Sequence, residues 1–105
     1  MDEKFLALRK GLLEFAVLSV ISKEKVYASD ILKALHETDF STQEGTLYPL
    51  LSRLRREGLV DYEWEESSSG PPRKYYQLTA KGKTQLEDLQ NYWKGLNDTL
   101  KSLSR

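Results

Sequence analysis

The chain has no cysteine and a single histidine, His36, among its 105 residues. Without cysteine it can form neither disulfide bonds nor thiolate metal sites, and it has no cysteine nucleophile. Glu37 and Asp39 lie close to His36, but one histidine without a second ligand four residues away is far more often a surface residue than a metal ligand. Because no motif for a nucleophile, a general base or a cofactor is present either, we expect no metal, no cofactor and no enzymatic activity.

Long apolar runs are also missing, so no segment is expected to cross a bilayer. Charged residues open the chain, but the apolar core and the small-residue cleavage site of a signal peptide do not follow. We therefore expect a cytoplasmic protein without membrane contact. The length and the 39% hydrophobic content are enough for one modest core, and hence for one compact unit with an appendage.

Neither sign of charge is in excess, since 16 basic residues balance 16 acidic ones. A net charge of zero argues mildly against nucleic acid as a partner. The charges are unevenly distributed, however. Acidic residues cluster at residues 61–66, whereas basic residues form groups at residues 53–56, 73–74 and 81–83. A neutral protein can therefore still have a basic face.

Apolar spacing predicts two helices in the first third of the chain. Residues 5–21 are apolar on a broad stripe, which is typical of a largely buried helix. After a break at residues 22–25, residues 27–37 repeat a helical period through Ile31 and Leu35. The second helix should be the shorter one.

A third helix is predicted before residue 58. Ser41 followed by Glu44 has the spacing of a capping box that starts a helix, and Gly58 is placed to end it. One core-facing stripe is formed by Leu47, Leu50, Leu51 and Leu54. Pro49 cannot donate a hydrogen bond to the carbonyl of Gly45, so we expect a kink or an irregular first turn.

The hydrophobic period changes to two after the third helix. Aromatic and aliphatic residues alternate with acidic ones over residues 60–65, which predicts a half-buried strand with a charged outer face. Residues 67–72 are unfavourable for a strand, and residues 73–78 resume one, so we expect a hairpin with a long tip. Tyr75 and Tyr76 should point to opposite faces, one into the core and the other partly exposed.

A long final helix is predicted after Thr79, its expected N-cap. Its apolar residues recur every three or four positions as a heptad seam: Leu86, Leu89, Trp93, Leu96, Leu100 and Leu103. A helix with such an uncovered stripe needs a partner, most simply the same helix or the first helix of a second subunit. We therefore expect a homodimer with these six residues at its interface.

The predicted order of elements is that of a winged helix-turn-helix followed by a dimerisation helix. We expect a mainly α fold with a small β-hairpin, with a DNA-binding domain at residues 1–78 and the dimerisation helix at residues 79–105. In such a domain the helix before the hairpin enters the major groove of DNA, and the hairpin reaches the neighbouring backbone.

The exposed face of the third helix is small and hydroxyl-bearing near its start and cationic further along. This composition suits base edges and phosphates, although an ordinary solvated helix face is the alternative. The acidic residues of the first strand should face away from DNA. The residues expected to contact double-stranded DNA are Lys10, Thr42, Gly45, Thr46, Tyr48, Pro49, Arg53, Arg73 and Lys74.

Three segments resemble the PadR family of transcriptional regulators: GTLYPLLSRL at residues 45–54, EGLV at residues 57–60 and RKYYQLTAKG at residues 73–82. The resemblance implies a dimeric repressor that reads a palindromic operator, in the short subfamily with a single C-terminal helix. Two segments depart from the family pattern. Residues 27–30 lack its frequent Gly-Tyr-Glu, and residues 70–72 are less basic than usual, so the wing should make fewer phosphate contacts.

Two questions stay open at this stage. Trp93 lies in the middle of the heptad seam, where it either fills the dimer interface or, as in some short regulators of the resembled family, lines a pocket for a planar hydrophobic molecule. The filling role is the more common one for an aromatic residue. The neutral net charge also leaves an alternative function: a protein-interaction module whose degenerate winged helix does not bind DNA.

Overall fold

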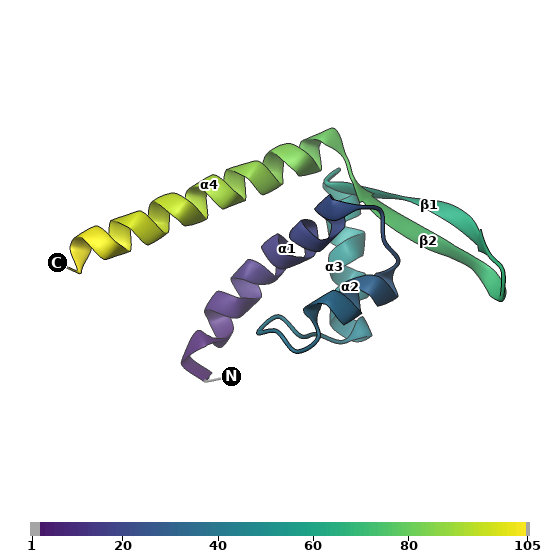
Figure 1. Ribbon diagram of the computed structural model, residues 1–105, viewed down its shortest axis with the longest axis horizontal. Helices are drawn as coiled ribbons and strands as arrows, with labels where there is room; N and C mark the ends of the chain where they lie inside the picture. The colour runs from purple at the N-terminus through teal and green to yellow at the C-terminus, as the bar shows by residue number, and fades with distance from the viewer. Residues whose placement is uncertain (1–2, 105) are drawn as a thin grey trace.

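The computed structural model describes residues 3–104. Figure 1 shows a small helical body from which a hairpin extends to one side and a long helix to the other. The elements in chain order are η1 (Glu3–Phe5), α1 (Leu6–Lys23), α2 (Ala28–Leu35), α3 (Glu44–Arg56), β1 (Val60–Ser67), β2 (Gly70–Leu78) and α4 (Ala80–Leu103). The predicted architecture, mainly helical with one β-hairpin and a long last helix, is confirmed.

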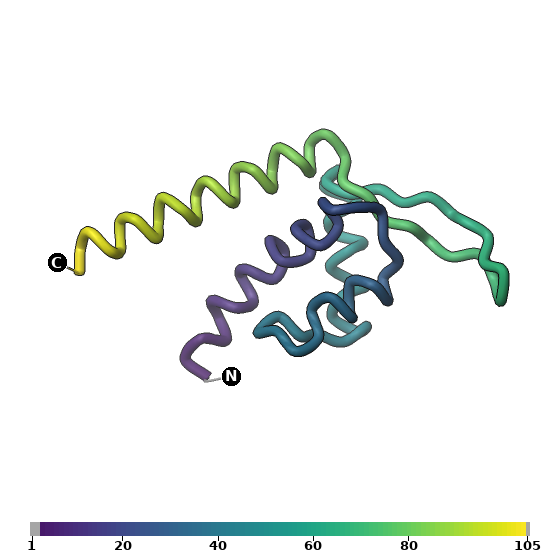
Figure 2. Tube along the Cα trace, in the orientation of Figure 1, coloured from purple at the N-terminus to yellow at the C-terminus, as the bar shows by residue number. Residues whose placement is uncertain are grey.

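One core joins the three short helices to the base of the hairpin and the start of α4. Its buried side chains are Val17, Leu18, Ile21, Val26, Ala28, Ile31, Leu35, Leu47, Leu51, Leu54, Leu59, Val60, Tyr76 and Leu86. The trace in Figure 2 shows α4 leaving this core after its first turns and continuing past α1. The molecule is accordingly elongated, with extents of 57, 31 and 21 Å.

Hydrogen bonds connect the end of α3 to the start of α4. Gly58 has a φ of 77°, and the Leu59 N–H donates to the Leu54 carbonyl at 2.9 Å, which closes a glycine C-cap. The Thr79 hydroxyl donates to the Gly58 carbonyl at 2.6 Å and accepts from the Gly82 N–H at 3.0 Å. Both sequence expectations, a helix end at Gly58 and an N-cap at Thr79, are confirmed.

The predicted capping box at the start of α3 is wrong. Gln43 is the N-cap, without a side-chain capping bond, and Glu44 is the first helical residue. Ser41 belongs instead to the preceding turn, where its N–H donates to the Thr38 carbonyl at 3.1 Å. α3 then runs as one α-helix through Pro49.

The predicted long hairpin tip is also wrong. The antiparallel strands pair as far as Ser67 and Gly70, so only two residues form the tip. Pro71 and Pro72 therefore lie inside β2. Proline is tolerated there because each strand of a two-stranded hairpin has a free edge, and because the register shifts between Glu65 and Ser67.

Candidate nucleic-acid interface

The outer face of α3 has the composition that its sequence predicted. Leu47, Leu51 and Leu54 are buried, and Leu50 packs against the core from a half-buried position. The exposed residues of the helix include Gly45, Thr46, Tyr48, Pro49, Ser52 and Arg56. Thr42, which was expected on this face, precedes the helix and is half-buried. The start of α3 therefore has a surface of small and hydroxyl-bearing side chains that can approach another molecule closely.

The hairpin has one face in common with α3. Tyr62 pairs with Tyr76 and Trp64 with Lys74 in the strand register, so these four side chains share that face. Tyr76 is buried against the helices, whereas Trp64 is 62% exposed because the outer half of the hairpin extends beyond the body. Tyr75 lies half-buried on the other face, so the predicted division of the two tyrosines is confirmed.

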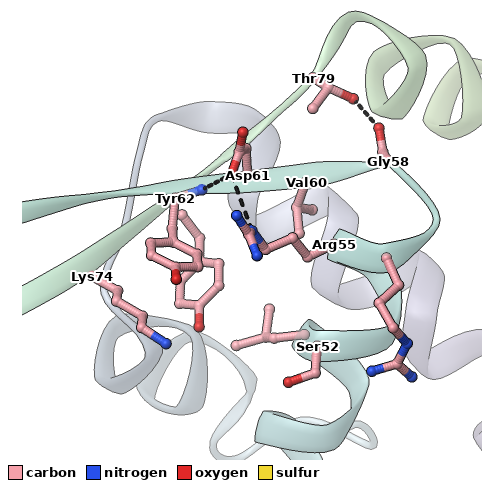
Figure 3. A pocket seen from close by; sticks show the side chains of 11 residues that line it. Ser52, Arg55, Gly58, Val60, Asp61, Tyr62, Lys74 and Thr79 are labelled. Carbon is pink, nitrogen blue, oxygen red and sulfur yellow. Dashed lines mark hydrogen bonds and ion pairs between the residues drawn. The ribbon is translucent and has the colours of Figure 1, made fainter.

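A cleft of about 520 Å³ lies between α3 and this face of the hairpin. Figure 3 shows Ser52 on the helix side of it, and Tyr62 and Lys74 entering it from the strands. Arg55 reaches from the helix to Asp61, which borders the cleft at β1. A second hollow of about 430 Å³ shares Lys74 and Tyr76 and extends to the start of α2 and to Trp64. The two hollows together border α3 along its side toward the hairpin.

The opposite face of the hairpin is acidic and is packed against the α1–α2 turn. Lys25 forms ion pairs with Glu65 and, at 3.9 Å, with Glu63. The hydrogen bond and charge of Glu65 raise the pKa of Lys25 above its ordinary value. Tyr27 stacks on Tyr75 with ring centres 3.9 Å apart, and hydrogen bonding to the Tyr27 hydroxyl raises the pKa of Tyr75 to about 12. These contacts fix the angle of the hairpin to the body.

Arg73 and Lys74, both expected at phosphates, are separated by the strand. Successive side chains point to opposite faces. Lys74 faces α3, whereas Arg73 is opposite Glu65 in the register and has its guanidinium 5.0 Å from the Tyr27 ring centre. Arg73 still lines the second hollow, but its main contacts are on the acidic face.

Arg53 is engaged within the chain. Its guanidinium contacts the Glu14 carboxylate of α1 and the Glu57 carboxylate, each at 2.9 Å. The hydrogen bonds that Arg53 donates to these two carboxylates, the one to Glu14 first, raise the pKa of Arg53. Both terminal amino groups of Arg53 are thus paired with carboxylates of its own chain, and Arg53 connects α1 to α3 in this structure.

Two further basic residues differ from the sequence expectation. Lys10 is exposed on α1 and lines neither of the two hollows beside α3. Arg55, which was not among the expected contacts, lies in the cleft. The sequence indicated a role for Arg55 only through its place in the basic group at residues 53–56. Its ion pair with Asp61 could not be predicted from helical periodicity, because Asp61 lies beyond the end of α3.

The predicted seam of α4 is divided between two surroundings. Leu86 is only 6% exposed and Leu89 packs against the core, so Leu86 in particular has little surface left for a dimer interface. Trp93 is 43% exposed and Leu100 55%. Leu96 is half-buried and Leu103 is exposed.

Apolar hollows of about 310 and 280 Å³ adjoin Trp93 between α1 and α4. Leu12 and Phe15 of α1 line both of them, and Phe40 lines the first. We call this surface the α1–α4 groove. Within residues 3–104, no helix is both long and apolar enough for a membrane span, and no group of three metal-ligating side chains occurs.

Comparison with known proteins identifies the family. Residues 17–88 match the model of the PadR-like family of transcriptional regulators. A PadR-like transcription factor from Bacteroides fragilis is 48% identical, with 97% of this chain and 99% of that chain covered and a TM-score of 0.83. PadR-like regulators from Bacillus cereus and Eggerthella lenta are 38% and 36% identical, each with a TM-score of 0.83. The alignments cover 94% and 95% of this chain and 97% and 88% of theirs. The chain therefore has the winged-helix fold of the PadR-like family of transcriptional regulators and belongs to that family.

Proposed function

We propose that the protein is a dimeric repressor that binds a palindromic operator through α3 and the hairpin. The proposal rests on the composition of the outer face of α3. Gly45 and Thr46 expose only small side chains there, and the cleft beside the helix contains Arg55 and Lys74. Helix N-termini and small side chains allow close approach to base edges, and cations neutralise phosphates. Glu63 and Glu65 of the hairpin contact Lys25 on the other side, so the zero net charge of the protein is compatible with a basic DNA-binding face.

A second copy of the chain is the proposed occupant of the α1–α4 groove. Most of the exposed large hydrophobic side chains of residues 3–104 lie on η1, α1 or α4, including Leu8, Trp93 and Leu100. Covering them in one symmetric contact would give two α3 helices related by a two-fold axis, as two operator half-sites require. We accordingly assign residues 79–105 to dimerisation, although Gly82 and Leu86 at the start of α4 pack within the body.

DNA binding is tested by titrating the protein against a fluorescent duplex from its own promoter region at two salt concentrations. We expect the promoter duplex to bind more tightly than a mixed-sequence duplex. Both affinities should fall as salt rises, because roughly 0.9 counterions are released for each phosphate that the protein neutralises. If the protein shows no preference for the promoter duplex and its affinity does not depend on salt, the alternative holds, namely a protein-interaction module that does not bind DNA.

Thr46→Ala should weaken operator binding by about tenfold, because it removes a hydroxyl from the part of α3 expected at base edges. Binding to the mixed-sequence duplex should change little, so that the ratio of the two affinities falls. Both affinities are measured by fluorescence anisotropy. Thr84→Ala is the matched control, since it removes the same side chain from an exposed position of α4. Equal losses in the two variants would contradict a role for Thr46 in reading bases.

We further propose that a planar hydrophobic molecule can enter the groove at Trp93 and act as an inducer. The support is the apolar lining on both sides of this indole. A ligand between the subunits would change the spacing of the two α3 helices, with a coupling of about 1–3 kcal/mol between ligand and operator.

The test of this proposal uses Trp64→Phe, which leaves Trp93 as the single tryptophan. Planar aromatic compounds should quench its fluorescence saturably, and the same compounds should lower the operator affinity of the protein. In Trp93→Phe the remaining signal of Trp64 should stay unchanged. Quenching that does not saturate, or that occurs equally in both variants, would leave Trp93 as a filler of the interface.

A further inference from the structure

The cleft between α3 and the hairpin holds more cations than carboxylates. Arg55 and Arg56 come from the last turn of α3, Lys74 from β2, and Asp61 from β1. Figure 3 shows Arg55 reaching across to Asp61, with Lys74 on the other side of the cleft. The distance from Arg55 Nε to Asp61 Oδ1 is 3.2 Å. The lining of this cleft, at the border of the proposed DNA interface, therefore includes one carboxylate, paired with Arg55, and three basic residues.

Asp61 is held in place by its own strand. Its Oδ1 accepts a hydrogen bond from the Tyr62 N–H at 2.8 Å in addition to the one from Arg55. The backbone N–H first, and then Arg55, lower the pKa of Asp61, so the carboxylate is charged at neutral pH. Both Asp61 and Arg55 are more than half exposed, so solvent and an incoming anion can reach the pair.

The Tyr62 ring brings a second cation to the same place. The Arg55 guanidinium lies 4.6 Å from the ring centre, and the Lys74 Nζ lies 4.5 Å from it. An aromatic face attracts each cation, whereas the two cations repel each other. Within the described residues, the hydrogen bond of Arg55 to Asp61 uses only Nε, so its terminal amino groups keep the geometry to bind a phosphate.

From this arrangement, and resting on the proposed function, we propose that Asp61 is an internal substitute for a DNA backbone phosphate. Asp61 forms an ion pair with Arg55 in the free protein. When a phosphate enters the cleft between Arg55 and Lys74, Arg55 exchanges Asp61 for the phosphate. The exchange replaces one anion by another at the same guanidinium, and the charge of Asp61 remains nearby to repel the phosphate. Asp61 therefore lowers the affinity for DNA of any sequence, while the start of α3 provides the discrimination.

The test compares the full chain with Asp61→Asn, Arg55→Gln and the double variant, using a short mixed-sequence duplex as the probe. Asp61→Asn should bind this duplex about fivefold more tightly, because the exposed ion pair that competes for Arg55 is lost. It should also steepen the salt dependence by about one counterion. The same factor should apply to the promoter duplex, so that the ratio of the two affinities is preserved. In the Arg55→Gln background, Asp61→Asn should give little gain.

Glu63→Gln is the matched control, because it neutralises a carboxylate two residues further along the same strand that contacts Lys25 instead of Arg55. Its effect on affinity should be much smaller. An equal gain from Glu63→Gln would mean that only total charge matters, and an undiminished gain in the Arg55→Gln background would mean that Asp61 does not act through Arg55. Either result overturns the proposal. A wild-type chain without preference for its promoter would contradict sequence-specific repression alone, since the effect of Asp61 is measured on mixed sequence.

Discussion

Gly82→Ala should destabilise the protein by about 3 kcal/mol or more, or prevent its folding. A β-carbon at this position would lie 1.9 Å from the carbonyl oxygen of Leu59 and 2.9 Å from its carbonyl carbon. The obstacle is buried backbone, which cannot rotate aside as a side chain can, and overpacking of this kind typically costs about 1–3 kcal/mol or more. The Leu59 carbonyl also accepts the Thr79 N–H at 3.1 Å, so the displacement would loosen the junction of α3 with α4. Denaturant unfolding at a fixed protomer concentration measures the loss.

Gly95→Ala is the control for this prediction, because Gly95 lies in the same helix and a β-carbon there would meet nothing within 4 Å. Alanine is favoured over glycine in a helix interior, so this variant should be more stable by about 1 kcal/mol. Opposite signs for the same substitution would identify the contact with Leu59 as the cause. Equal effects at Gly82 and Gly95 would show that α4 can move away from Leu59 at little cost.

The elements of this fold could be predicted where their signals are local. Gly58 ends α3 because its positive φ suits glycine, and Thr79 starts α4 because its hydroxyl reaches the N–H three residues later. The hairpin tip could not be predicted in the same way. Pro71 and Pro72 disfavour a strand by themselves, and only the pairing of just two strands, with free outer edges, makes them acceptable.

The interface could be predicted as a face but not as a set of contacts. Helical periodicity indicates which residues of α3 point outward, but it cannot show that Arg53 meets Glu14, which lies 39 residues earlier in the chain. The heptad spacing of α4 is equally ambiguous. It marks Leu86 and Leu100 alike as apolar, although Leu86 packs in the core of its own chain and Leu100 lies beyond the body. Periodicity in the sequence shows that one face of a helix is apolar, but only the folded structure shows which residues pack against that face.

Leu100→Glu should dissociate the proposed dimer and lower the apparent affinity for the operator by about 100-fold or more. Leu100 is 55% exposed and lies outside the protomer core, so the fold of the single chain should survive the change. In a dimer closed over the α1–α4 groove, the carboxylate would have to be buried without a partner, which is strongly unfavourable. A monomer would engage one half-site at a time and lose the gain from joining two binding events, which is typically a factor of about 10² to 10⁴.

The matched control for Leu100→Glu is Asn91→Glu, which adds the same charge on the opposite side of α4. The two positions are nine residues apart, which corresponds to a half-turn at about 100° per residue. Sedimentation and anisotropy titrations should find the control dimeric with almost unchanged operator affinity, and Leu100→Glu monomeric with a circular dichroism spectrum like that of the wild type. If Leu100→Glu stays dimeric and binds the operator normally, the apolar outer half of α4 does not hold the two subunits together. The two reading helices would then have to be joined through another surface.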